Sequence, residues 1–245
     1  MVGSLLAKTY PDADEWRELV EKFTPSAVAH KLLLAHVPFV WKDEPLKFAL
    51  FRRTVADAFG VQPTDVFVVG SAMAGRSLKG PEIDHVYSDG SDIDTLIVSE
   101  NLFTSYVMKS LEWLRDVTKP TFNGSKSVSP SLLPEQVKNV GWFSQAACRG
   151  IWRPDSLPKN APARQEFFGR FSEVSLKTLG LQLSDDTVAK VNGRVARSFH
   201  DAVEDLAGSI LRLRNEFRGE QDDAEPPELP PSKDGALPPS APTKS

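Results

Sequence analysis

Apolar residues recur with the period of an amphipathic helix in several separate segments of the chain. In the first segment, residues 14–23, the positions i, i+3, i+4 and i+7 are all apolar: Trp16, Leu19, Val20 and Phe23. Asp12 and Glu15 stand three residues apart at its start, which predicts a capping box. The same period predicts further helices over residues 26–36, 45–59 and 105–117, from 164 onward, and over about 185–217. In the helix over 45–59, which Gly60 ends, the predicted inward positions are Leu46, Ala49, Leu50, Val55 and Phe59.

Two short apolar runs show a different pattern, which predicts buried strands. The sequence of residues 66–69 is Val-Phe-Val-Val, and that of residues 93–98 is Ile-Asp-Thr-Leu-Ile-Val; both are rich in β-branched residues. Glycines and prolines interrupt residues 118–160, which we therefore predict to be irregular. Together these elements predict an α/β (α+β) fold with a small mixed sheet, flanked by N-terminal and C-terminal helices.

The pattern divides the chain into four parts. We expect N-terminal helices over residues 1–44, a core over 45–160, a C-terminal helical region over 161–218 and a tail over 219–245. The tail holds seven of the 19 prolines, together with acids and no aromatic residue. It cannot bury enough apolar surface to offset the entropy lost on ordering, so we predict that it is disordered.

Composition excludes several classes of protein. The chain has 245 residues, 40% of them hydrophobic, and its 29 basic and 33 acidic side chains are typical of a soluble protein. Its one cysteine, Cys148, excludes an internal disulfide and fits the reducing cytoplasm. No apolar run approaches the roughly 18 residues of a membrane span. Residues 1–218 carry 27 basic and 27 acidic side chains, so we expect no strong non-specific binding to nucleic acid.

Candidate chemistry lies where the two predicted strands meet polar residues. The first strand runs into Gly70 and Ser71; a glycine lets the backbone approach a phosphate, and a hydroxyl can donate a hydrogen bond to it. Asp92 and Asp94 stand at the start of the second strand, and alternate strand residues share a face. Two neighbouring carboxylates repel, and a bound hard cation such as Mg²⁺ (or Mn²⁺) resolves the repulsion. This equipment is typical of metal-assisted phosphoryl or nucleotidyl transfer.

With these residues the sequence resembles the nucleotidyltransferase superfamily related to DNA polymerase beta. Gly70-Ser71 after one apolar strand, and Ser91-Asp92-Ile93-Asp94 leading into the next, match both halves of the family signature, and the resemblance covers roughly residues 45–118. It implies a nucleotidyltransferase core in which Asp92 and Asp94 bind two divalent ions that hold a nucleoside triphosphate. It also implies that Gly70 and Ser71 contact the triphosphate.

The sequence departs from the family pattern in two places. The gap between Ser71 and Asp92 is 20 residues long, and its bases Arg76 and Lys79 are candidate contacts for the triphosphate. Active members of the family supply a third carboxylate from a later strand. Here Asp155 is the later candidate ligand, although the sequence around it is also that of a simple turn.

Two hypotheses of function follow. In the first, the chain is a magnesium-dependent nucleotidyltransferase that moves a nucleoside monophosphate from a triphosphate to an unidentified hydroxyl, on a small molecule, an RNA end, a protein or a second nucleotide. In the alternative, it is a catalytically incomplete sensor or partner subunit that binds nucleotide and metal. A third acid beside Asp92 and Asp94 would favour the enzyme, and an apolar residue or a base there would favour the binding protein. A structure without a sheet shared by residues 66–69 and 93–98 would point instead to an interaction scaffold.

Overall fold

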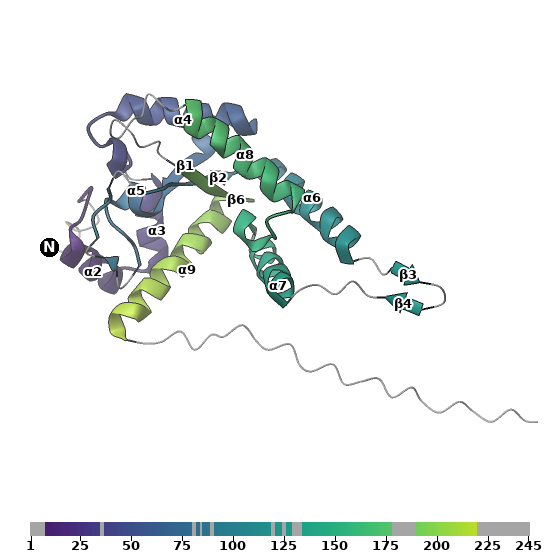
Figure 1. Ribbon diagram of the computed structural model, residues 1–245. Coiled ribbons are helices and arrows are strands. Elements are labelled where there is room, and N and C mark those ends of the chain that lie inside the picture. The colour runs from purple at the N-terminus through teal and green to yellow at the C-terminus, as the bar shows by residue number, and fades with distance from the viewer. Residues whose placement is uncertain are drawn as a thin grey trace, which may run out of the picture.

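A mixed four-stranded sheet lies at the centre of the molecule (Figure 1). The computed structural model describes residues 8–34, 37–79, 82–83, 85–88, 91–118, 121–123, 126–128, 134–177 and 190–219. Its sheet strands are β1 (Val66–Val69), β2 (Ile93–Val98), β5 (Ile151–Trp152) and β6 (Val191–Ala196), in the spatial order β1-β2-β6-β5. β1 is antiparallel to β2, β6 is parallel to β2, and β5 is antiparallel to β6. The predicted sheet shared by residues 66–69 and 93–98 is therefore confirmed.

Helices cover both faces of this sheet, which confirms the mixed α/β class (Figure 1). One face packs against α4 (Pro45–Phe59), α6 (Glu100–Thr118) and α8 (Pro162–Lys177). The other packs against α3 (Pro25–Leu34) and α9 (Phe199–Arg218), and α2 (Ala13–Lys22) lies beside α9. The smaller helices are α5 (Gly70–Ala74), α7 (Pro134–Cys148) and the 3-10 turns η1 (Phe39–Trp41), η2 (Pro63–Asp65) and η4 (Pro154–Ser156). β3 (Thr121–Asn123) and β4 (Lys126–Val128) form a separate antiparallel pair.

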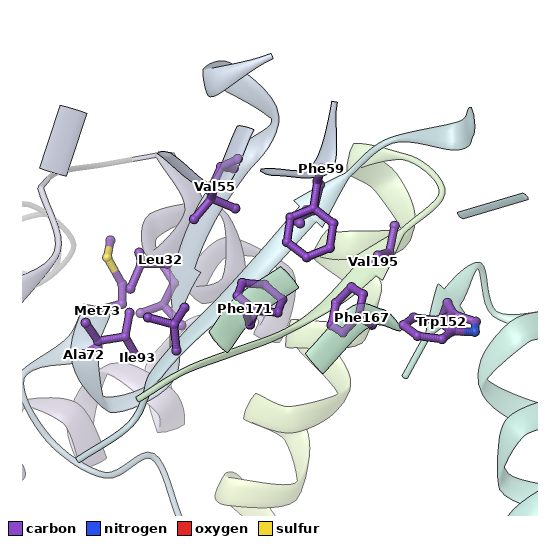
Figure 2. Packing of buried hydrophobic residues seen from close by; sticks show 14 of the residues in the cluster. Leu32, Val55, Phe59, Ala72, Met73, Ile93, Trp152, Phe167, Phe171 and Val195 are labelled. Atoms are coloured by element: carbon purple, nitrogen blue, oxygen red, sulfur yellow. The ribbon is translucent and has the colours of Figure 1, made fainter. Parts of the chain in front are cut away.

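Aromatic rings fill the core between the sheet and α4, α6 and α8 (Figure 2). The ring of Phe171 lies 4.8 Å from that of Phe59, and Phe167 lies 4.8 Å from Trp152. These rings press on β6 at Gly193, where a Cβ would be 2.8 Å from Phe171. The strand therefore needs a residue without a side chain at this position, and the close approach fixes β6 against α8.

Several predicted elements are confirmed. α2 has the predicted capping box between Asp12 and Glu15, and α4 ends at Gly60, whose φ of +68° is the left-handed conformation that glycine adopts without strain. Within α4, the predicted inward positions Val55 and Phe59 are buried. The inward prediction is wrong for three other residues of α4, since Leu46 is 79% exposed, Leu50 is 64% exposed and Ala49 is also exposed.

The later part of the chain differs from its prediction. Residues 118–160, predicted to be irregular, contain α7 and β5. The helix predicted over about 185–217 is wrong in its first half, because Val191–Ala196 is strand β6, and the helix α9 begins only at Phe199. The sheet therefore draws one of its central strands from the region 161–218, which the sequence predicts as helical. The predicted disordered tail lies outside the described residues except for Gly219.

No helix among the described residues combines the length and the apolar character that crossing a membrane requires.

Candidate functional site

The end of β1 and the start of β2 meet at Gly70. Gly70 follows β1 directly, has a φ of +68°, and opens the short helix α5. Val69 pairs with Asp94 on β2, which brings the Asp94 side chain over the glycine. A Cβ placed on Gly70 would be 3.0 Å from Oδ2 of Asp94. The predicted glycine turn and the predicted carboxylate are thus direct neighbours.

β6 presents polar side chains to the same carboxylates. Asn192 pairs with Asp94 across the parallel strands, so the alternate positions Lys190, Asn192 and Arg194 lie on the face that carries Asp92 and Asp94. The Nδ2 of Asn192 donates a hydrogen bond of 2.8 Å to Oδ2 of Asp92, and the Nζ of Lys190 lies 3.2 Å from the same oxygen. The strand beside the two acids therefore offers an amide and two bases.

The environment of Asp94 makes its charged form more costly than it is in water. Burial raises the pKa of Asp94, Arg194 and Lys79 act in the opposite direction, and the charges of Asp92 and Asp155 raise that pKa further. A divalent cation would relieve this cost, because a carboxylate that must lose water is stabilised by a close positive charge. The donor set of two carboxylates on one face suits Mg²⁺ or Mn²⁺, which prefer oxygen ligands. The residues present at this point therefore fit a divalent cation.

A buried ion network lies behind Asp94. Asp205 of α9, whose side chain is 8% exposed, lies between two arginines: the Nη2 of Arg153 donates a hydrogen bond of 2.6 Å to Oδ1, and the Nε of Arg194 is 2.9 Å from Oδ2. Burial alone would raise the pKa of Asp205, but the two arginines outweigh it and lower that pKa. The network is a structural unit that joins β6 and α9 to the residue after β5.

A cavity of about 1050 Å³ opens over the glycine turn and the two acids. Its lining includes Gly70, Ser71, Lys79, His85, Asp92, Asp94, Arg194 and Arg212. The cavity thus combines carboxylates, which can bind a cation, with basic side chains and a hydroxyl, which can bind an anion. A phosphate group with its counter-cation is the class of ligand that uses both kinds of group.

A second cavity, of about 1100 Å³, adjoins the first at Asp94 and Arg194. It lies among α7, β5 and α9, and its lining includes Trp142, whose side chain is exposed, and Arg149. Gly208 of α9 also lines it, with no atom within 4 Å of the place a Cβ would take. Asp94 therefore stands at the junction of the two cavities, whereas Asp92 lines only the first.

The loop base Arg76 has a different contact from the one expected. Its Nη1 donates a hydrogen bond of 3.0 Å to the backbone carbonyl of Ile83, and its backbone forms a bridge with Val86. This contact ties the loop between α5 and β2 together. Lys79, the other base of that loop, lines the cavity with Asp92 and Asp94.

Asp155 is not brought together with the other two acids. It lies in the turn η4, its side chain is 81% exposed, and it forms an ion pair of 3.7 Å with Arg164. It lines the second cavity, to which Asp94 also contributes. Within the described part of the chain, no group of three His, Cys, Asp or Glu side chains is arranged to hold a metal ion.

Sequence reasoning missed Lys190, Asn192, Arg194 and Asp205. The signal for the first three is their alternation, since polar residues at every second position predict one solvated face of a strand. Asp205 has no comparable signal, because an acid inside a helix pattern is ordinarily a surface residue.

Comparisons with protein-family models, with curated proteins and with solved structures find no match for this chain.

Proposed function

We propose that this chain binds a nucleoside triphosphate together with a divalent cation, Mg²⁺ or Mn²⁺, and works as a nucleotide-binding sensor or partner subunit. The observation that carries the proposal is that β6 places Asn192 and Arg194 on the face of Asp92 and Asp94. The carboxylate pair and the glycine turn support binding of a metal–phosphate ligand. The amide of Asn192 and the guanidinium of Arg194 beside them favour nucleotide binding over nucleotidyl transfer.

Each part of the ligand has candidate contacts. Asp92 and Asp94 would hold the cation, and Gly70 and Ser71 would lie against the phosphates. Lys79 would add a positive charge from the loop. The cation, when bound, supplies the positive charge that lets the phosphates approach two carboxylates. The sheet would then be a nucleotidyltransferase-like core, in a protein expected in the cytoplasm.

The charges around the two acids favour nucleotide binding over nucleotidyl transfer. Two divalent ions that jointly hold a triphosphate need several anionic ligands, because each ion must be stripped of part of its water shell. Here Asp92 is hydrogen-bonded to Asn192 and lies close to Lys190, and Asp94 is influenced by Arg194. A strand with an amide and two bases at this place supports a site for a single cation.

Nucleotidyl transfer to an acceptor hydroxyl is the second candidate. The second cavity, which Trp142 and Asp94 line, favours it, because a second substrate bound there would lie next to Asp94. The carboxylates would then orient the triphosphate toward that acceptor. The acceptor class is the same as the sequence leaves open: a small molecule, an RNA end, a protein or a second nucleotide.

Calorimetric titration of the full chain with each nucleoside triphosphate, in Mg²⁺ or Mn²⁺, tests the proposal, with pyrophosphate release followed in the same samples. We expect binding of at least one triphosphate, loss of that binding in the double variant Asp92→Ala/Asp94→Ala, and no pyrophosphate. Asp57→Ala is the matched control, since it removes an exposed acid that lines neither cavity, and it should bind as the wild type does. Pyrophosphate release that the double variant abolishes would establish the enzyme. Failure of every triphosphate to bind would reject both candidates.

A further inference from the structure

We infer that the second cavity, among α7, β5 and α9, binds a ligand that joins a planar aromatic ring to a single phosphate, such as a nucleoside monophosphate, without a metal ion. This site is separate from the triphosphate site, and the inference does not depend on the proposed function. It also goes beyond the second candidate function, which leaves the class of acceptor open, because it names the chemistry that this cavity recognises.

One face of α7 and one face of α9 line this cavity, where the two helices diverge from the sheet (Figure 1). α7 contributes four residues at the i, i+3, i+4 and i+7 spacing of a single helix face: Trp142, Gln145, Ala146 and Arg149. α9 contributes five residues that also share one face: Asp201, Glu204, Asp205, Gly208 and Arg212. Each face has a small residue near its middle, Ala146 or Gly208, so the space between the helices stays open.

Trp142 gives the cavity a surface on which an aromatic ring can stack. Its side chain is 45% exposed, whereas Trp16, Trp41 and Trp152 are buried. An indole in contact with water loses the hydrophobic free energy that burial would supply, and a ring stacked on it would recover part of this. Stacking on an aromatic side chain is also how proteins hold nucleotide bases, because every base has a flat face.

Arg149 and Arg212 give the cavity a place for a phosphate. Both side chains are exposed, and neither forms an ion pair in the part of the chain that the structure describes, whereas Asp205 holds Arg153 and Arg194. An arginine without an acid partner can bind a phosphate through charge-assisted hydrogen bonds. Arg149 lies two helical turns after Trp142, about 10 Å along the axis of α7. A ligand that reaches both therefore needs a spacer such as a sugar between its ring and its phosphate.

The acids of the cavity limit the charge that the ligand can carry. Three of those that line it form ion pairs with arginines: Asp155, Asp201 and Asp205. Asp94 and Glu204 line it as well. One phosphate carries a charge of about −1.5 to −2, which two guanidinium groups balance without a cation. The further phosphates of a triphosphate would lie near Asp94 and Glu204, which would repel them. The cavity therefore favours a monophosphate.

Titration of the full chain with AMP in EDTA, by calorimetry and by tryptophan fluorescence, tests the inference with divalent cations removed. We expect AMP to bind and to quench part of the emission. Adenosine, which lacks the phosphate, and ribose 5-phosphate, which lacks the ring, should each bind at least about tenfold more weakly. Trp142→Phe, which keeps a ring but removes the indole, should lose the quenching and still bind AMP in the calorimeter.

Arg149→Gln tests the phosphate contact, because Arg149 lines only the second cavity. It should weaken AMP binding about tenfold and leave the weaker binding of adenosine unchanged. Arg53→Gln is the matched control, since Arg53 is an exposed arginine that lines neither cavity, and it should bind AMP as the wild type does.

Gly208→Leu tests the location of the site by filling the cavity from α9. No atom lies within 4 Å of the place that a Cβ at Gly208 would take, so the leucine side chain enters open space. It should weaken AMP binding at least about tenfold and leave triphosphate binding in Mg²⁺ unchanged, because Gly208 does not line the first cavity. Gly169→Leu makes the same change in α8, equally without close atoms and outside both cavities, and should bind AMP as the wild type does. Both variants should fold, since leucine favours a helix more than glycine does.

Several results would overturn the inference. They are AMP binding that Gly208→Leu leaves unchanged, AMP binding that Asp92→Ala abolishes, since Asp92 lines only the first cavity, and equal binding of AMP and adenosine. Failure of the wild type to bind millimolar AMP would also overturn it, while metal-dependent triphosphate binding would still support the proposed function. AMP binding that Gly208→Leu removes, in a chain that binds no triphosphate, would support the inference and reject the proposed function.

Discussion

The carboxylate of Asp94 lies against Gly70, so that a Cβ on this glycine would be 3.0 Å from Oδ2 of Asp94. We expect Gly70→Ala to weaken binding of Mn²⁺ and nucleotide at least tenfold, because Asp94 must turn away from its place over the turn. The variant should also lose about 1 kcal/mol of stability, since an alanine at a φ of +68° is strained. Calorimetric titration and urea unfolding measure the two effects.

The variant Gly60→Ala separates the effect of backbone strain from that of the contact between Gly70 and Asp94. Gly60 also has a φ of +68°, but no atom lies within 4 Å of the place where its Cβ would be. It should therefore lose similar stability and bind Mn²⁺ as the wild type does. Equal binding by the two variants would show that the contact between Gly70 and Asp94 has no part in the site.

Because Asn192 donates a hydrogen bond to Asp92, the effect of placing a third acid at position 192 can be predicted. Asn192→Asp replaces a donor 2.8 Å from Oδ2 by a carboxylate, so we expect the free protein to lose about 1–2 kcal/mol of stability at neutral pH. A divalent cation would bind between the acids and restore the loss. Thermal unfolding with and without Mn²⁺ measures this, and the Tm should rise more in the variant than in the wild type. An equal rise in both proteins would contradict the prediction.

Asp205 should make stability depend on acid pH. Its pKa in the folded protein is lower than in the unfolded chain because of Arg194 and Arg153, so its contribution is complete above the usual range of aspartate, near pH 4. The contribution falls away as the pH drops through the lower folded value. Asp205→Asn should cost about 3 kcal/mol at pH 7, because it leaves two arginines without their acid.

Urea unfolding between pH 7 and pH 3 tests this dependence. The difference in unfolding free energy between the wild type and Asp205→Asn should shrink as the pH falls. Asp57→Asn is the control: Asp57 is 75% exposed and 3.8 Å from Arg53, so its effect should stay within about 0.5 kcal/mol. A gap that stays constant down to pH 3 would mean that the arginines do not lower the pKa of Asp205.

Gly193 tests the packing of the central strand. A Cβ there would be 2.4 Å from Oγ1 of Thr95 and 2.8 Å from the ring of Phe171. We therefore expect Gly193→Ala to lose about 1–3 kcal/mol through overpacking. Gly169→Ala, in α8 with no atom within 4 Å of the added carbon, should gain about 0.5–1 kcal/mol, because alanine favours the helix. Urea unfolding measures both, and a neutral Gly193→Ala would contradict the packing around β6.

The elements that the sequence predicts correctly bury a regular apolar pattern. β1 is a continuous apolar run and β2 ends in the apolar run Leu96-Ile97-Val98, and both lie between the two layers of helices. α2 has an apolar stripe together with a capping box. In α4 the sequence pattern misplaces the inward face by including Leu46 and Leu50, because a leucine is apolar whether or not another element covers it.

β6 was missed because its residues serve a site as well as the core. Val191 and Val195 are buried and four residues apart, which is also the spacing of a helix, and the strand residues between them are Asn192, Gly193 and Arg194. Two of these face the acids, and the third is kept small by Phe171. The acids and the glycine turn were therefore predictable, whereas the amide and the base that face them depend on a strand pairing that no local pattern specifies.

The order of the strands has a consequence for the chain as it is synthesised. β2 lies between β1 and β6, but Lys190, which leads into β6, is 98 residues beyond its partner Asp92. At ordinary translation speeds this delay is about 5–20 s. During that time one edge of β2 has no neighbour to pair with, and the two carboxylates lack the bases that later face them. The nascent chain therefore passes through an interval in which an open strand edge invites pairing with other chains, and a chaperone would act on it there.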